Sequence, residues 1–252
     1  MDLGLSDRVF AVTAASGGLG RASAEQLVAE GARVVLVARR ADVLDDAVAD
    51  LGSANAVALA SDLADPGTAQ AAAELAIRTF GRLDGALISV GGPPPGGALS
   101  NSDEQWLAAF DSVFLAALRT VRAVLTAATG PAAIGVVLST SVKVPIPGLA
   151  ISNGLRPGLA MLIKQLADEA GPDGHRLFGL MPGTVLTERI RFLHGQSGDP
   201  AAARTDAESR IPLRRLGEPA EFGRVAAFLL SPAASYVSGS VIPVDGGALR
   251  AL

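Results

Sequence analysis

Short apolar runs alternate with longer, helix-patterned segments along the whole 252-residue chain. The runs are almost continuously apolar, as is typical of parallel strands buried on both faces, and lie at residues 8–13, 33–38, 56–60, 84–89, 135–139, 177–181 and 241–244. Helical patterns fill the intervals at residues 19–30, 42–51, 66–80, 103–128, 155–170 and 219–230. We therefore predict an α/β fold, a single doubly wound (Rossmann-type) domain over residues 1–252 with about seven parallel strands and helices on both faces.

Charge and composition narrow the classes of function. The formal net charge is −4 and the pI is near 5.2, which gives no electrostatic basis for binding nucleic acid or an anionic membrane. Cysteine is absent and the only histidines, His175 and His194, lie far apart in sequence, so we expect no metal site. The first residues lack the pattern of a signal peptide, and no apolar run approaches the ~18 residues of a membrane span. We expect a soluble, cytoplasmic protein.

A glycine-rich turn joins the first predicted strand to the first predicted helix. It reads Thr13-Ala14-Ala15-Ser16-Gly17-Gly18-Leu19-Gly20. Glycines at such a turn let backbone N–H groups approach a pyrophosphate, and the N-terminus of the helix adds a favourable dipole. The turn therefore predicts a dinucleotide site; a tight turn without a ligand is the alternative.

The end of the second predicted strand bears on which nucleotide binds. It reads Val37-Ala38-Arg39-Arg40, with no acid. An acid here would accept a hydrogen bond from the 2′-hydroxyl of NAD(H), whereas Arg39 can make a charge-assisted contact with a 2′-phosphate. We therefore favour NADP(H) over NAD(H); a solvated Arg39 at a helix start is the alternative.

These motifs resemble those of the short-chain dehydrogenase/reductase family, and 3-oxoacyl-carrier-protein reductases within it. The turn resembles Thr-Gly-x-x-x-Gly-x-Gly with Ala14 at the first glycine position, which needs a negative φ or tolerated strain. The segment 182–187 resembles the Pro-Gly-x-x-x-Thr motif near the nicotinamide, and the segments 211–219 and 238–247 resemble the closing motifs of the family. The only tyrosine, Tyr236, falls next to the last of these, where we expect a packing residue.

The resemblance implies the composition of the cofactor site. It comprises Ala14, Ser16, Gly18, Leu19, Gly20, Arg39, Asp62, Leu63, Gly91, Arg156, Pro182, Gly183, Val185 and Thr187. Asp62 and Leu63 match an Asp-hydrophobic pair beside the adenine, although an Asp at that place could equally cap the next helix.

The chain departs from the family at the catalytic positions. Where the family carries Tyr-x-x-x-Lys, it reads Ser152-Asn153-Gly154-Leu155-Arg156, which resembles a divergent subgroup that also has a Gly-Gly-Pro-Pro-Pro-Gly-like loop, here residues 91–96. The family also carries a catalytic serine at a fixed distance before the tyrosine, and Ser139 lies at that distance before Ser152, with Ser141 as the alternative. A count from Trp106 places Val113 where the family carries its catalytic asparagine.

The replacements change the chemistry that the site can perform. A serine hydroxyl is shorter than a phenol and a far weaker acid than tyrosine at pKa ~10, and an arginine stays charged and cannot cycle a proton. We expect Ser139, Ser152, Arg156 and Lys143 to be the catalytic residues. Ser139 and Arg156 would polarise a carbonyl oxygen, and a water or Lys143, on the loop after the fifth strand, would supply the proton.

The leading hypothesis is an NADP(H)-dependent oxidoreductase that acts on a small carbonyl or alcohol substrate, with residues 188–218 as a substrate lid. The second is a non-catalytic protein that binds a dinucleotide or a partner, and a third is a fold whose cofactor pocket is closed. The resemblance also implies a homo-oligomer, a dimer or a tetramer, with the long helices 103–128 and 155–170 pairing across a two-fold axis.

Overall fold

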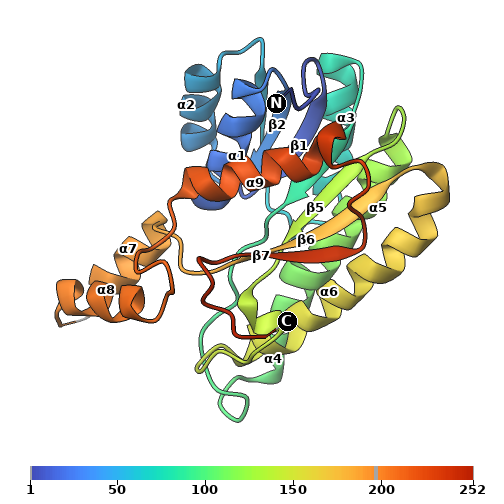
Figure 1. Cartoon of the computed structure of the whole chain (residues 1–252). Helices are drawn as coiled ribbons and strands as arrows, with labels where there is room; N and C mark the ends of the chain where they lie inside the picture. The colour runs from blue at the N-terminus through green and yellow to red at the C-terminus, as the bar shows by residue number, and fades with distance from the viewer. Residues whose placement is uncertain (1, 196–197, 252) are drawn as a thin grey trace.

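Seven strands form one parallel sheet in the order β3-β2-β1-β4-β5-β6-β7 (Figure 1). The computed structural model describes residues 2–195 and 198–251, and its strands are β1 (Val9–Thr13), β2 (Arg33–Ala38), β3 (Ala56–Ala60), β4 (Gly85–Ile88), β5 (Ala133–Val137), β6 (Arg176–Pro182) and β7 (Ser240–Val244). The strand order reverses between β1 and β4. This reversal is the switch point at which doubly wound sheets bind ligands, so the predicted fold class is confirmed.

Helices cover both faces of the sheet and enclose two hydrophobic cores. One face carries α1 (Gly18–Ala29), α2 (Ala41–Leu51) and α9 (Pro219–Leu230), and the other carries α3 (Thr68–Phe80), α5 (Ala116–Ala127) and α6 (Ala150–Ala170). Helices α1 and α9 pack closely because Gly223 has no side chain: a Cβ there would lie 2.6 Å from the carbonyl oxygen of Ala22. Phe222 is fully buried beside this contact, and burial of such a side chain contributes roughly 1.5–3 kcal/mol.

The predicted helix over residues 103–128 is divided into three parts. It consists of α4 (Asp103–Ala109), a π-helical segment (Phe110–Leu115) and α5. Buried residues recur every four positions at Ala109, Val113, Ala117 and Val121. A regular α-helix turns every 3.6 residues and would rotate such a row away from the core, and the wider π turn absorbs this drift.

Two predicted boundaries near the candidate site are wrong. Strand β5 occupies residues 133–137 rather than 135–139, so Ser139 lies two residues beyond its end. Helix α6 begins at Ala150 rather than Leu155, so that Pro157 lies inside the helix and not near its start. The first turn of α6 was not predicted because residues 152–154 are small or polar and interrupt the apolar periodicity of the helix.

The segment predicted as a lid contains two helices that the sequence pattern did not indicate. Helices α7 (Glu188–Gly195) and α8 (Pro200–Ser209) project from the body of the molecule beside the start of α9 (Figure 1). Asp199 caps α8 by accepting hydrogen bonds from the backbone N–H groups of Ala201 and Ala202, and Pro200 occupies the first helical position. Among the described residues, no helix combines the length and hydropathy that a membrane span requires.

Candidate functional site

A cavity of about 870 Å³ lies at the carboxyl ends of the four strands around the switch point. It receives residues from the turn after β1, the end of β2, the loop after β3 and the loop after β4. Of the predicted cofactor residues, those that line it are Ala14, Ser16, Arg39, Asp62, Leu63 and Gly91. The structure therefore brings together residues that are up to 77 positions apart in the sequence.

The glycine turn has the close backbone geometry that a diphosphate needs. Gly18 has a φ of 57°, and a Cβ on Gly20 would lie 2.7 Å from the carbonyl oxygen of Ala14. No side chain larger than hydrogen fits at Gly20, so α1 begins directly against the end of β1. Ala14 itself has a φ of 51°, which shows that this alanine adopts the left-handed conformation in place of the glycine of the family motif.

Three charged side chains stand at the outer end of this cavity. The guanidinium of Arg39 lies 3.9 Å from a carboxylate oxygen of Asp62, in a pair that is open to solvent. Arg40 donates a hydrogen bond of 3.4 Å to the hydroxyl of Ser16. The two arginines thus frame the mouth of the cavity, where they can meet an anionic group on an adenosine ribose.

The loop after β4 is tied to β1 through one side chain. The Thr13 hydroxyl donates to the Ser89 carbonyl oxygen at 2.6 Å and accepts from the Ser89 N–H at 2.8 Å. Both backbone groups of Ser89 are therefore paired with the Thr13 hydroxyl. The loop that continues into Gly91 is therefore fixed at the centre of the sheet.

A second cavity, of about 690 Å³, lies beside the first one. The two share Gly92 and Pro93 of the loop after β4. Its walls are mainly apolar and come from the loop after β5, the start of α6 and the C-terminal segment; they include Val144, Pro145, Ile146, Pro147, Leu149 and Leu249. The polar residues of the lining are Ser139, Thr140, Ser152, Arg156, Thr184 and Arg250.

The serine hydroxyls of this site are organised in two layers. Ser139 and Ser152 line the cavity, whereas Ser141 is buried outside the lining. The hydroxyls of Ser141 and Ser152 lie 3.2 Å apart in a hydrogen bond, and the Ser139 hydroxyl accepts from the Ser141 N–H at 3.1 Å. Of the two candidate serines, Ser139 lines the cavity and Ser141 does not.

Arg156 is a buried cation of the site. Only 7% of the residue is exposed, and its guanidinium donates a 2.8 Å hydrogen bond to the carbonyl oxygen of Val137 at the end of β5. A guanidinium keeps its charge even when it is buried, and this one lines the same cavity as Ser139 and Ser152. The arrangement can stabilise negative charge on a bound group but cannot donate a proton in turnover.

Asn153 is a residue of the site whose role the sequence did not indicate. Its side-chain oxygen accepts from the Ile146 N–H at 3.0 Å, and its side-chain nitrogen donates to the Ile146 carbonyl oxygen at 2.9 Å. The pair fixes the apolar loop 144–147 against the first turn of α6. The wall of the second cavity is held in place by this contact, and only a prediction that α6 begins before residue 153 could have found it.

The remaining predicted residues fall in different places. Lys143 is exposed on the loop after β5 and is not among the residues that line the second cavity. Val113, at the asparagine position, is buried in the π segment. The side chain of His194, in the predicted lid, lies outside the described residues. Within the described ranges, no group of three or more His, Cys, Asp or Glu residues could hold a metal ion.

The segment that resembles Pro-Gly-x-x-x-Thr passes from the second cavity to the glycine turn. Pro182 and Gly183 line the second cavity. The Thr187 methyl group lies 3.4 Å from the point at which Gly18 would carry a Cβ. Val185 faces elsewhere, since it pairs with Gly217 and lines a third cavity.

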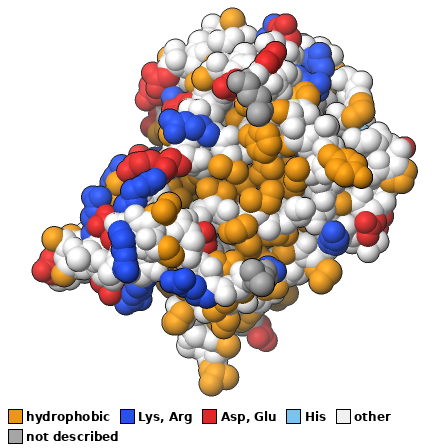
Figure 2. Space-filling view, in the orientation of Figure 1, with side chains coloured by type: hydrophobic (Ala, Val, Ile, Leu, Met, Phe, Trp, Pro, Cys, Tyr) orange, Lys and Arg blue, Asp and Glu red, His pale blue; other side chains and the backbone are white. Residues whose placement is uncertain are grey.

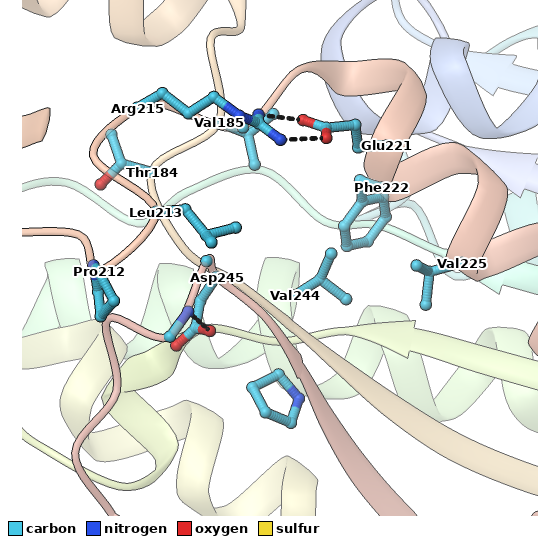
Figure 3. A pocket seen from close by; sticks show the side chains of 14 residues that line it. Thr184, Val185, Pro212, Leu213, Arg215, Glu221, Phe222, Val225, Val244 and Asp245 are labelled. Atoms are coloured by element: carbon cyan, nitrogen blue, oxygen red, sulfur yellow. Dashed lines mark hydrogen bonds and ion pairs between the residues drawn. The ribbon is translucent and has the colours of Figure 1, made fainter.

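The third cavity, of about 610 Å³, lies between β7, the start of α9 and the loop 212–217 (Figure 3). Phe222, Val225 and Val244 form an apolar wall, and the two-pronged ion pair between Arg215 and Glu221 crosses its rim at 2.7 and 2.6 Å. The hydrogen bonds from Arg215 and from the Glu218 N–H lower the pKa of Glu221 to about 2. This cavity lacks the serines and the buried arginine of the second one.

Tyr236 is fully exposed, so the prediction of a packing role for it is wrong. It stands between η4 (Pro232–Ala234) and β7, in a turn whose backbone is closed by a hydrogen bond from the Val237 N–H to the Ala234 carbonyl oxygen. Tyr236 precedes the first residue of β7, at the amino ends of the strands, whereas the serine and arginine groups lie at their carboxyl ends.

Comparison with known proteins agrees with this architecture. A family model described as enoyl-(acyl carrier protein) reductase matches residues 13–248. Levodione reductase of Leifsonia aquatica is 33% identical over 261 residues, covering 96% of this chain and 94% of its own length.

Two solved structures are similar over nearly their whole length. L-sorbose reductase from Gluconobacter frateurii, complexed with NADPH and L-sorbose, has a TM-score of 0.94 at 31% identity and covers 100% of both chains. A short-chain oxidoreductase from Pseudomonas aeruginosa PAO1, described as containing an atypical catalytic center, has a TM-score of 0.91 at 30% identity and covers 99% of this chain and 100% of its own.

The doubly wound sheet, the glycine turn at its switch point and the adjoining cavities define a dinucleotide-binding oxidoreductase fold. With these relatives, the chain belongs to the short-chain dehydrogenase/reductase family.

Proposed function

We propose that the protein is an NADP(H)-dependent oxidoreductase that reduces a carbonyl or oxidises an alcohol with an altered catalytic centre. The observation that carries the proposal is the position of the second cavity. It joins the dinucleotide cavity through Gly92 and Pro93, and it gathers Ser139, Ser152 and Arg156 in its lining. The NADPH complex of the sorbose reductase and the atypical center described for the Pseudomonas relative are consistent with it.

The residues present fit a phosphorylated dinucleotide. The turn at Gly18 and Gly20 offers backbone N–H groups at the start of α1, and these two residues have no Cβ of their own to block them. Arg39 and Arg40 stand at the end of β2, where a 2′-phosphate of NADP(H) would meet two guanidiniums. Strand β2 itself ends in no acid for the 2′-hydroxyl of NAD(H), and the nearby carboxylate of Asp62, on the loop after β3, is paired with Arg39. Leu63 supplies an apolar contact for an adenine in the same cavity.

The nicotinamide, when bound, would supply or accept a hydride. The chain's own groups then have to bind the substrate oxygen and stabilise the charge that develops on it. Ser139 and Ser152 offer hydroxyl donors, and Arg156 offers a permanent positive charge fixed on the end of β5. Preorganised donors of this kind act most strongly in a cavity with apolar walls, because the charge is little screened there.

The proton would come from water. The described residues that line the second cavity include no Asp, Glu, His, Lys or Tyr. Serine is too weak an acid and arginine too weak a proton donor to take the place of a phenol. We favour water over Lys143, because Lys143 is exposed and does not line the cavity.

A non-catalytic dinucleotide-binding protein is the second candidate. The replaced tyrosine, lysine and asparagine positions favour it, as does the buried Val113, which offers no polar group at the asparagine position. The two functions differ in one respect: only the enzyme transfers a hydride.

The test is oxidation of NADPH by the purified protein over a panel of ketones, aldehydes and sugars, with nucleotide binding measured in parallel. The proposal expects turnover with at least one member, and a large loss in Ser139→Ala while NADPH binding stays intact. Binding without turnover across the panel would move the protein to the second candidate.

We also propose that the protein is a homo-oligomer. Figure 2 shows an apolar area on the face that carries α9 and β7. Strand β7 is an edge of the sheet, and exposed apolar side chains near it include Leu213, Phe228 and Tyr236. On another face, Leu107, Phe110 and Met161 of α4, the π segment and α6 are exposed in the manner expected for paired helices. Light scattering on the purified protein would give the number of subunits.

A further inference from the structure

Two side chains at the start of α7 cover the glycine turn. A carboxylate oxygen of Glu188 lies 3.6 Å from the point at which Gly17 would carry a Cβ, and the Thr187 methyl group lies 3.4 Å from the corresponding point on Gly18. Gly17 and Gly18, which are described, line neither of the two adjoining cavities. The two adjoining cavities are therefore open, whereas the start of α7 lies against the glycine turn.

The base of α7 is held firmly in this position. The Leu186 N–H donates to the Gly217 carbonyl oxygen at 2.8 Å, and the Gly217 N–H donates to the Thr184 carbonyl oxygen at 3.1 Å. The first turn of α7 still lies against the body, since Ile190 lines the second cavity, and the rest of the helix projects outward with α8 (Figure 1). The position of the Glu188 carboxylate is therefore fixed by the backbone contacts just before α7, although the end of the helix does not pack on the sheet.

The turn is the place at which a dinucleotide pyrophosphate meets the start of α1. A helix N-terminus attracts anions, so it favours both a pyrophosphate and a nearby carboxylate. The two anions repel each other when both are present, and the repulsion is only partly screened beside a protein surface.

We infer that Glu188 is a residue that limits cofactor affinity, because its carboxylate lies beside the pyrophosphate of bound NADP(H) and repels it. The inference rests on the proposed nucleotide site. Glu188 would thereby favour release of the cofactor. Its carboxylate competes with the pyrophosphate for the positive end of the α1 dipole and so weakens pyrophosphate binding. The adenosine end of the nucleotide is expected at Arg39, in a cavity that Glu188 does not line.

The experiment compares Glu188→Gln with wild type by calorimetric titration of two ligands. NADPH carries the pyrophosphate, whereas adenosine 2′-phosphate carries only the group expected to bind at Arg39. Glu74→Gln is the matched control, because Glu74 is exposed on α3 and its replacement changes the net charge by the same amount. Each titration is run at low and at high salt.

The inference expects NADPH to bind Glu188→Gln about tenfold more tightly than wild type, as removal of one unit charge a few ångströms from the ligand implies. Adenosine 2′-phosphate should bind both proteins equally, and Glu74→Gln should behave as wild type. The gain should shrink toward none at ~1 M salt, where charges are screened beyond ~3 Å.

Equal NADPH affinities in wild type and Glu188→Gln would overturn the inference and leave the proposed function standing. An equal gain for adenosine 2′-phosphate would also overturn it, because the effect would then be one of net charge. Failure of both ligands to bind any of the three proteins would defeat the proposed function together with the inference. Binding of NADPH to Glu188→Gln alone would support the inference in its strongest form.

Discussion

The guanidinium of Arg156 donates a hydrogen bond of 2.8 Å to the carbonyl oxygen of Val137, and this contact fixes a permanent charge at the end of β5. The position corresponds to the lysine of the Tyr-x-x-x-Lys motif in the family. Because arginine does not give up its proton, the charge is present in every step of a reaction. In the proposed function, this charge would stabilise an anion at the altered site.

Replacement of Arg156 should affect both stability and turnover. Arg156→Met leaves the buried Val137 carbonyl oxygen without this donor, which should lower the free energy of unfolding by about 1–3 kcal/mol and abolish hydride transfer. Arg156→Lys keeps the positive charge, so it should lower the free energy of unfolding and the rate of hydride transfer less than Arg156→Met does. Urea denaturation and NADPH oxidation measure the two effects. Arg78→Met, on the exposed face of α3, is the control and should stay within about 0.5 kcal/mol of wild type.

Ala14→Gly should stabilise the glycine turn. Ala14 has a φ of 51°, and the left-handed conformation costs a residue with a Cβ roughly 1–2 kcal/mol, against about 0.5–1 kcal/mol for the added freedom of glycine in the unfolded chain. We expect an unchanged or higher Tm and NADPH affinity no weaker than that of wild type. In Ala15→Gly, at a buried neighbour without a positive φ, the Tm should fall. A lower Tm in Ala14→Gly would show that the alanine is unstrained.

Gly154→Ala should disturb the start of α6. A Cβ at this position would lie 2.8 Å from two ring carbons of Trp106, so the indole or the helix has to shift, at a cost of about 1–3 kcal/mol. Trp106 is the only tryptophan of the chain, and its fluorescence should change with the substitution. Gly171→Ala is the matched control, because open space surrounds that position and its φ is −58°. An unchanged emission spectrum in Gly154→Ala would contradict the close contact.

The Arg215–Glu221 pair should make stability depend on pH in the acid range. Its hydrogen bonds lower the pKa of Glu221 to about 2 from the usual 4.5. A carboxyl whose pKa is lowered by folding adds stability above its unfolded pKa, and this contribution is lost as the pH falls from 4.5 toward 2. The pair is exposed to solvent, so the contribution should stay below about 1 kcal/mol.

Arg215→Gln tests this dependence. The variant should have a lower Tm than wild type at pH 7, and the difference should narrow as the pH falls below 4.5. Thermal unfolding at several pH values, followed by circular dichroism, gives the comparison. A constant difference between the two proteins at all pH values would contradict the role of the pair.

The sequence predicted the sheet and the position of the glycine turn well because their signals are local. A buried parallel strand is a continuous apolar run, and the glycine turn lies between one such run and a helix, so β1, β2 and β3 were found within one residue. The start of α6 was missed because Ser152, Asn153 and Gly154 break the apolar periodicity.

The rest of the site depends on contacts across long stretches of chain. Asn153 holds Ile146 through its side chain, and Glu188 lies over Gly17, 171 positions earlier in the sequence. Neither contact leaves a periodic or compositional trace. The position of Ser141 behind Ser152 likewise follows from the path of the loop after β5. The sequence spacing alone could not decide whether Ser139 or Ser141 is the serine of the site.

Titration of the purified protein with NADPH and with NADH, in wild type and in Arg39→Ala, tests the proposed nucleotide site most directly. NADPH should bind wild type more tightly than NADH does, and Arg39→Ala should weaken NADPH binding by about tenfold or more while NADH binding changes little. Failure of both nucleotides to bind wild type would contradict the account, since the fold would then stand without the cofactor chemistry on which the proposed function depends.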